Sequence, residues 1–424
     1  MAHSDRQSER RAAEPATTAR RLYRFLTRPR VVAAVYILVL CAGFLLETRA
    51  HRNLLYLLGV PLFLLLSAGF DWRWLRDSLI AQLTLAYLGY FLLSALWSDG
   101  PSWSDWADLL RLSFLVLLFL ATTLQLGVRD PAFPGHLFLS YALTAGLSLV
   151  AAFGAAAVGL LPFGAAAVGV LPFGPRFTGF GLASHPIIGA TLYGVALLLS
   201  AFVLLPRAKT WYARLVWLAV IVLCAAFMLV SGSRGPLIAL AAALVVGFAI
   251  AGRRAAVLVL ALAVGGIAIG ALFDFYPIVI LYERAESGHF EIWQQVLAAI
   301  AERPWFGYGS LVEIYFDGGY GPTRSPHNLP LANQLYGGLP ATILLAGLLL
   351  AATLQGWRSA RAGAPVCLVL LVFGLVASLF DTRSLVQSLG REWIAVWLPI
   401  ALLAAQEVQA RAAPLSSPAD GPRA

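Results

Sequence analysis

Charge is scarce in this sequence: Asp, Glu, Lys and Arg together make up 12% of its 424 residues, whereas 60% of the residues are hydrophobic. Soluble globular domains carry about 25% charged residues, so the composition excludes that class. The mean hydropathy of +0.80 is instead typical of a chain that crosses a membrane several times.

Cysteine is also rare, and the usual metal-binding patterns are absent. Cys41, Cys224 and Cys367 all lie within long apolar segments, with the spacing of neither a metal site nor a disulfide framework. The sequence has no Asp-x-Asp, no His-Glu-x-x-His and no cluster of carboxylates in the connections that we expect outside the membrane. We therefore expect neither a metal ion nor another cofactor.

Long apolar segments make up most of the chain. A helix that crosses a bilayer needs about 17 to 25 apolar residues, and by this measure the sequence predicts an all-α polytopic membrane protein with about twelve transmembrane helices. The segments run from 31 to 46, 53 to 70, 78 to 97, 107 to 126, 136 to 158, 183 to 205, 211 to 230, 236 to 251, 254 to 272, 329 to 354, 364 to 380 and 391 to 406.

The basic residues predict the orientation of these segments. Residues 1 to 30 contain eight arginines, no apolar run and no small-residue cleavage site, which indicates a cytoplasmic tail and no cleaved signal peptide. With this tail inside, 20 of the 30 Lys and Arg residues fall on the cytoplasmic side. The net charge of +9 then faces anionic membrane lipids and gives no reason to propose a nucleic acid partner.

This topology divides the chain into five parts. Nine helices in 31–272 are followed by one large outer loop, 273–328, and by three more helices in 329–406; residues 1–30 and 407–424 are cytoplasmic tails. The loop contains "HFEIWQQVLAAIAERP", whose helical spacing predicts an amphipathic helix. That helix either lies on the membrane surface or packs on the bundle. Its expected apolar face consists of Phe290, Trp293, Val296, Leu297 and Ile300.

A tandem repeat occupies residues 153 to 172, where "FGAAAVGLLP" is followed by "FGAAAVGVLP". Two copies are too few for a solenoid. We interpret the repeat as a duplicated spacer and assign no chemistry to it.

Three arginines at the outer ends of the segments are candidates for binding an anion. They are Arg176, Arg234 and Arg284. Arg234 stands between Gly232 and Gly235 in "SGSRGP", a turn that can bring backbone N–H groups and a guanidinium to one anion. Because guanidinium groups are permanently charged and bidentate, their convergence at a bilayer surface indicates a lipid-linked phosphate or pyrophosphate.

His327 closes the large loop in "RSPHNLPLANQLYGGLP". Asn328 suits a helix N-cap and Pro330 suits the first turn, so His327 should lie immediately before the tenth helix. The helix dipole and the neighbouring arginines favour a neutral imidazole, which can act as a general base. The competing histidines are His51, His136, His185 and His289.

A resemblance to a known family appears at these residues. "SGSRG", then "EIWQQVLAAIAERPWFGYG", then "SPHNLPLANQLYGGLP", in this order across residues 176 to 345, resembles the O-antigen ligase and polymerase superfamily. The basic tail, the modest loop and the single His motif are most similar to O-antigen ligases of Gram-negative bacteria.

The resemblance implies a C-type glycosyltransferase architecture in the bacterial inner membrane and a metal-independent, inverting transfer at the periplasmic side. The donor would be a glycan on undecaprenyl pyrophosphate, and the acceptor the lipid A-core oligosaccharide. The family's pattern makes His327 the general base and Arg234 and Arg284 the catalytic arginines, with Arg176 also binding pyrophosphate. Many members have Gly-Arg where this chain has Gly288-His289, so His289 is a further candidate for that role.

Three alternatives remain open from the sequence. An O-antigen polymerase and a protein O-oligosaccharyltransferase share the same motifs. A transporter of lipid-linked oligosaccharides would carry charges deep within its helices, whereas the candidate residues here gather near one surface.

Overall fold

The structure is a computed structural model that describes residues 28 to 158, 176 to 252, 288 to 318 and 321 to 412. Within these ranges, nine helices are long and apolar enough to cross a membrane, and two apolar helices are shorter. These eleven coincide with eleven of the twelve predicted segments, and the other, 254 to 272, lies outside the described residues.

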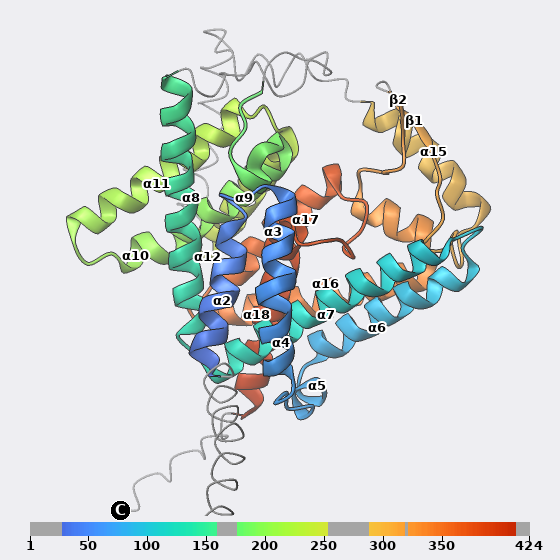
Figure 1. Cartoon of the computed structure of the whole chain (residues 1–424), viewed down its shortest axis with the longest axis horizontal. Helices are drawn as coiled ribbons and strands as arrows, with labels where there is room; N and C mark the ends of the chain where they lie inside the picture. The colour runs from blue at the N-terminus through green and yellow to red at the C-terminus, as the bar shows by residue number, and fades with distance from the viewer. Residues whose placement is uncertain (1–27, 159–175, 253–287, 319–320, 413–424) are drawn as a thin grey trace, which may run out of the picture.

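The helices form one bundle, with a smaller lobe at one side that contains α15 and a β-hairpin (Figure 1). Three helices run through π-helical turns: Thr48–Ser67 contains α3 and α4, Pro186–Arg207 contains α9 and α10, and α18 follows such a turn at Trp393–Trp397. The elements are α2 (Pro29–Ala42), α3 (Thr48–Leu54), α4 (Val60–Ser67), α5 (Arg73–Asp77), α6 (Leu79–Ser94), α7 (Trp103–Arg129), α8 (Phe133–Ala157), α9 (Pro186–Leu199), α10 (Leu205–Arg207), α11 (Trp211–Val230), α12 (Arg234–Ala251), α15 (His289–Glu302), β1 (Phe316–Gly318), β2 (Gly321–Thr323), α16 (Leu329–Arg361), α17 (Val366–Asp381) and α18 (Leu398–Ala412).

Several helices begin at a residue whose side chain caps the backbone. Ser78, Ser102, Thr210 and Asn328 each accept a hydrogen bond from the N–H three residues later. At Ser102 the backbone N–H in turn donates to the carboxylate of Asp105, which completes a capping box. These contacts satisfy N–H groups that have no partner within the helix.

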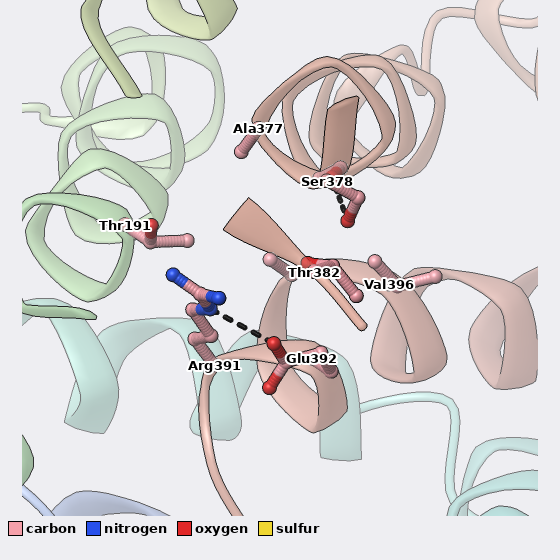
Figure 2. Close-up of a pocket in the computed structure, with 9 residues that line it drawn as sticks. Thr191, Ala377, Ser378, Thr382, Arg391, Glu392 and Val396 are labelled. Carbon is pink, nitrogen blue, oxygen red and sulfur yellow. Dashed lines mark hydrogen bonds and ion pairs between the residues drawn. The ribbon is translucent and has the colours of Figure 1, made fainter. Parts of the chain in front are cut away.

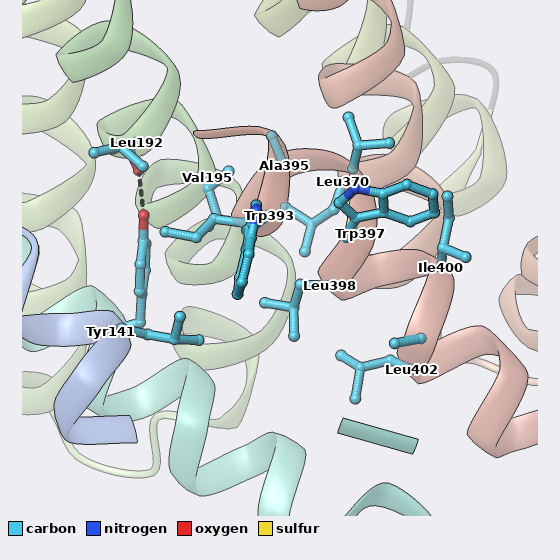
Figure 3. Packing of buried hydrophobic residues seen from close by; sticks show 14 of the residues in the cluster. Tyr141, Leu192, Val195, Leu370, Trp393, Ala395, Trp397, Leu398, Ile400 and Leu402 are labelled. Atoms are coloured by element: carbon cyan, nitrogen blue, oxygen red, sulfur yellow. Dashed lines mark hydrogen bonds between the residues drawn. The ribbon is translucent and has the colours of Figure 1, made fainter. Parts of the chain in front are cut away.

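Two buried tryptophans pack the last helix against the centre of the bundle. The side chains of Trp393 and Trp397 lie among apolar residues of α8, α9 and α17 (Figure 3). Each indole N–H finds a backbone carbonyl in the preceding loop: Trp393 donates to Gln387 at 2.9 Å and Trp397 donates to Leu385 at 2.8 Å. The same two side chains therefore fill the core and hold the α17–α18 loop in place.

Helix α16 is interrupted at Gly338, whose φ of 64° and ψ of −161° are not helical. The freed backbone groups are satisfied by the loop that follows α15: Tyr308 and Gly309 donate to carbonyls of α16 at 2.9 and 2.8 Å, and Leu339 donates to Trp305 at 3.0 Å. A Cβ on Gly338 would lie 2.3 Å from the Trp305 carbonyl oxygen. The first part of α16, which follows His327, is thus a separate short helix held by the loop that follows α15.

One side of helix α15 packs on protein. Ile292 and Val296 are buried against β1 and the first part of α16. The predicted apolar face was partly wrong, because Phe290 and Leu297 are exposed while Ile292 points into the small core. The hairpin and the loop before it cover one side of the helix and thereby select that side. Residues 159 to 172 of the tandem repeat lie outside the described ranges.

A close contact between α17 and the turn before α18 predicts a sensitive position. A Cβ on Gly374 would lie 2.0 Å from the carbonyl oxygen of Ala395, a backbone atom that cannot rotate away. We expect Gly374→Ala to cost about 3 kcal/mol of stability, measured as a lower thermal unfolding midpoint in detergent. The matched control is Gly89→Ala in α6, where no atom lies within 4 Å of the added methyl; its midpoint should stay level or rise. Equal midpoints for the two variants would contradict this packing.

Candidate functional site

Four helix ends and one loop meet around His327. Helix α17 packs against α9, α12 and α16, and its C-terminal residue is Asp381. The N-cap residues of α9, α12 and α16 are His185, Ser233 and Asn328, respectively. Because a helix N-terminus carries a partial positive charge, this arrangement favours an anion near the same place.

The "SGSRG" turn is held by Arg176. Its Nε donates to the Ser231 carbonyl at 2.7 Å and its Nη2 donates to the Ser233 hydroxyl at 2.8 Å. Gly232 has a φ of 60°, in the left-handed region that favours glycine. Arg176 therefore binds the turn that begins at the end of α11, so two of the predicted arginines, Arg176 and Arg234, lie close together.

Arg234 is the first residue of α12, and the next residue, Gly235, allows that end of the helix to pack closely against α17. A Cβ on Gly235 would lie 2.9 Å from Cβ of Phe380, so the bare glycine lets α12 approach the end of α17. Phe380 directly precedes Asp381. The turn predicted to bind an anion thus lies against Phe380, the residue next to Asp381.

His327 has a φ of 51°, an uncommon backbone conformation that it alone adopts among the non-glycine residues of the described ranges. Its N–H donates to the Ser325 hydroxyl at 3.1 Å, and the indole N–H of Trp293 donates to the Pro326 carbonyl at 3.0 Å. Asn328 caps α16 through the Leu331 N–H at 3.0 Å, as predicted. Contacts on both sides therefore hold a conformation that costs about 1 to 3 kcal/mol.

Asp381 orients the imidazole ring. Nδ1 of His327 lies 2.8 Å from Oδ1 of Asp381, and Nη1 of Arg391 donates to Oδ2 of Asp381 at 2.6 Å. Arg391 also donates to the Asp381 backbone carbonyl. Because an ionised carboxylate only accepts hydrogen bonds, Nδ1 carries the proton, and in a neutral ring Nε2 presents its lone pair.

Arg391 is itself held by a second carboxylate. Its Nε donates to Oε1 of Glu392 at 2.8 Å, and Figure 2 shows the guanidinium extending toward Thr191 of α9. These side chains line a small cavity of about 10 Å³, which is too small for a substrate and at the lower limit for one water molecule. The charged network thus supports His327 from inside the bundle.

The network also controls the charge of Asp381, which follows the last apolar residue of α17. Burial alone would raise the pKa of this carboxyl, but the hydrogen bond from His327 and the charge of Arg391 lower the pKa to about 2. Opposite charge and hydrogen bonding therefore outweigh desolvation. Asp381 is therefore ionised at neutral pH.

His289 lies beside His327. The His289 and His327 rings lie 5.4 Å apart in an edge-to-face arrangement. Burial lowers the pKa of His289, the charge of Arg234 and that of His327 in its protonated form lower it further, and Asp381 raises it. A neutral His289 therefore lies beside the candidate base, within the electrostatic reach of Arg234.

His185, which precedes α9, connects Arg176 with the same network. Burial lowers its pKa, the charge of Asp381 raises it, and the charges of Arg176 and Arg391 lower it. The sequence named His185 only as a competitor. In the structure it lies within the electrostatic reach of Asp381.

The structure brings four of the five predicted site residues to one place: Arg176, Arg234, His289 and His327. Arg284 lies outside the described residues. The site residues that the sequence did not assign are Asp381, Arg391 and Glu392. A signal for them exists, since ionisable residues at the ends of apolar segments are functional candidates, but no local pattern connects them with His327.

The arrangement provides a positioned base beside several cations. In the described part of the chain no group of three His, Cys, Asp or Glu residues is placed to hold a metal ion. The chemistry that these side chains offer is removal of a proton next to a site that attracts an anion.

Comparisons with known proteins point to one family. Residues 219 to 346 match a family model described as O-antigen ligase, a range that includes Arg234, His289 and His327. The chain is also similar to an O-antigen ligase of Pseudomonas aeruginosa, with 30% identity over 373 residues, which is 85% of this chain and 86% of that protein.

The ion network predicts how Asp381→Asn changes stability. Asp381 and Arg391 side chains are 18% and 13% exposed, so removing one charge leaves the other poorly solvated, at a cost of about 3 kcal/mol. The folded pKa lies below the ordinary 3.8, so the contribution is complete above about pH 4 and is lost as pH falls toward 2. Thermal midpoints of wild type and variant should therefore differ equally from pH 8 to 5 and converge below pH 4.

Asp108→Asn is the control for this experiment. Asp108 also pairs with an arginine, Arg111, but the two side chains are 67% and 41% exposed. Its loss should cost no more than about 0.5 kcal/mol. A similar small effect for Asp381→Asn would contradict the network as described.

Proposed function

The chain belongs to the O-antigen ligase family, and from that premise we propose that it transfers a glycan from undecaprenyl pyrophosphate to the lipid A-core oligosaccharide of lipopolysaccharide. The active site in this proposal is the His327 site, facing the periplasm from the bacterial inner membrane. The chain is a multi-pass membrane protein with an all-α fold. We propose the C-type glycosyltransferase architecture for that fold and a metal-independent reaction.

The observation that carries this proposal is the chain of contacts from Arg391 through Asp381 to His327, next to the turn that contains Arg234. A carboxylate on Nδ1 holds the ring in the tautomer in which Nε2 accepts a proton, as in other acid–base sites. A glycosyl acceptor needs a base for its hydroxyl, and a pyrophosphate leaving group needs positive charge. The same site offers both.

The proposed reaction is a single displacement. Nε2 of His327 takes the proton from an acceptor hydroxyl as the oxygen attacks the anomeric carbon of the donor. The bond between that carbon and the pyrophosphate oxygen breaks, and undecaprenyl pyrophosphate leaves with the electron pair. One displacement inverts the configuration at the anomeric carbon.

The leaving pyrophosphate gains negative charge, and we assign its stabilisation to arginines. Arg234 lies in the part of the site that the structure describes, and Arg176 binds the turn that precedes Arg234. We propose that Arg284 contributes from the large loop. His289 completes this side of the site as a neutral hydrogen-bonding group. Preorganised cations of this kind do the work that Mg²⁺ does in metal-dependent enzymes.

An O-antigen polymerase remains the second candidate function. It would use the same donor and the same His327 base but extend another lipid-linked chain. The similarity to the Pseudomonas aeruginosa ligase over 85% of this chain favours ligation. A protein O-oligosaccharyltransferase and a transporter have no specific observation in their favour.

A reconstituted transfer assay tests the function. Purified protein, undecaprenyl pyrophosphate-linked glycan and lipid A core are combined with a chelator, and products are separated by gel and identified by mass spectrometry. We expect glycan on lipid A core, and a decrease of about 10²- to 10⁴-fold for His327→Ala, because a general base contributes that much. The control is His136→Ala, which changes an exposed histidine at the start of α8 and should leave the rate unchanged.

The same assay separates the alternatives. Longer chains that remain on undecaprenyl pyrophosphate would identify a polymerase, and no transfer to either acceptor would contradict both enzymes. Substantial activity in folded His327→Ala protein would refute the assignment of the base.

Asp381 is a positioning residue in this proposal, so its effect should pass through His327. We expect Asp381→Asn to lower kcat by at least about 10²-fold, since an amide can hold the ring in the wrong tautomer. The double variant with His327→Ala should be no slower than His327→Ala alone, because residues that act as a unit are not additive. Multiplied losses in the double variant would show that the carboxylate acts independently of the base.

A further inference from the structure

Arg383 lies in the loop between α17 and α18, two residues after Asp381. Its guanidinium carbon lies 5.4 Å from the centre of the Tyr336 ring, in the first part of α16. The Tyr336 hydroxyl donates to the Arg324 carbonyl at 3.2 Å, three residues before His327. Arg383 therefore follows Asp381 closely along the chain and contacts a tyrosine whose hydroxyl is bonded to the segment before His327.

Arg383 differs from four other arginines of the chain because no carboxylate in the described ranges pairs with it. Each of the other four has an acidic partner within salt-bridge distance. The pairs are Arg111 with Asp108, Arg303 with Asp99, Arg324 with Glu313, and Arg391 with Asp381 and Glu392. Asp381, the nearest carboxylate in sequence, already uses both of its oxygens.

The loop holds Arg383 firmly without neutralising it. Leu385 and Gln387 accept hydrogen bonds from the two buried tryptophans at 2.8 and 2.9 Å. Thr382 and Leu385, which lie before and after Arg383 in the loop, are buried. Arg383 itself is half-buried. Fixing an arginine in this way lowers the entropy cost of binding an anion.

Arg234, Arg176 and Arg383 have different neighbours. Arg234 and Arg176 act on His289 and His185, respectively. Arg383 instead contacts Tyr336 of α16. If Arg234 and Arg176 serve the pyrophosphate of the donor, Arg383 is left for the other substrate.

We propose that Arg383 binds an anionic group, phosphate or carboxylate, of the acceptor glycolipid and thereby sets the position of the acceptor hydroxyl at His327. The inference rests on the proposed function, because it assumes that the second substrate is a glycolipid acceptor. The guanidinium can keep its place over Tyr336 while its N–H groups donate to the anion, since stacking uses the face of the group and hydrogen bonds use its edge.

A purely structural role for Arg383 would be to cover the buried Tyr336 ring. That role predicts a loss of stability on substitution but no dependence on the charge of the acceptor. Arg303 is a matched control, because its guanidinium lies 4.7 Å from the Tyr308 ring in the same way but also pairs with Asp99 at 3.4 Å.

The experiment compares wild type, Arg383→Gln, Arg383→Lys and Arg303→Gln in the full-length protein. Transfer is measured against acceptor and donor concentration with three preparations of lipid A core: untreated, phosphatase-treated and carboxyl-amidated. Thermal midpoints of all variants are recorded, and binding of each acceptor is measured without donor.

We expect Arg383→Gln to raise KM for untreated acceptor about 10- to 100-fold, the value of one charge-assisted hydrogen bond, with kcat and donor KM unchanged. Arg383→Lys should recover part of the loss, because lysine keeps the charge but not the bidentate geometry. For one of the two treated acceptors, the KM of wild type should rise by the same factor, while the KM of Arg383→Gln should not change further. The treatment that has this effect identifies the bound group as phosphate or carboxylate. Binding should follow KM, and Arg303→Gln should behave as wild type.

Other results would overturn the inference. An unchanged acceptor KM in folded Arg383→Gln, an equal effect of Arg303→Gln, or a shift in donor KM would each exclude the acceptor role. Those outcomes leave the proposed function intact, since wild type still transfers glycan to lipid A core. If wild type itself transfers nothing to lipid A core, the proposed function fails first.

Discussion

The site depends on the pairing of the Asp381 carboxylate with His327 and Arg391. One of its oxygens accepts from His327 and the other from Arg391, so the group has no freedom to rotate. Its backbone carbonyl also accepts from Arg391, which closes the loop from the end of α17 to the start of α18. The contact that orients the His327 ring therefore also helps to determine how two helices join.

Such a network is a poor way to gain stability. Desolvating several charges costs several kcal/mol, and their mutual attraction often no more than offsets this. The unusual backbone of His327 adds about 1 to 3 kcal/mol. Apolar packing around Trp393 and Trp397 lies directly beside the network and compensates for these costs. A conformation this expensive persists because its neighbours leave no alternative, and the result is one defined direction for the His327 ring.

The sequence predicted those parts of the site that have a local signature. Gly232 marked the turn around Arg234, and Asn328 with Pro330 marked the helix start after His327, because turns and caps depend on neighbours a few residues away. The eleven described apolar helices followed from segment length alone. Asp381 and Arg391 were not assigned, because their partners are defined only by how α17 packs. The facing side of α15 was partly wrong for the same reason, since the hairpin that covers it is a tertiary feature.

Helix ends explain why the catalytic candidates come together at one surface. In a low-dielectric bundle a charge deep within a helix is costly, whereas a helix terminus has backbone groups that need partners in any case. Arg234, Asn328 and Asp381 all stand at such termini. Glycines allow the termini to approach: Gly235 meets Phe380 beside the base, and Gly338 ends the short helix that His327 precedes. Close approach of the backbone at these glycines therefore helps to bring Arg234 and His327 together. A larger residue at either glycine would push the helix ends apart without changing the charge of any side chain.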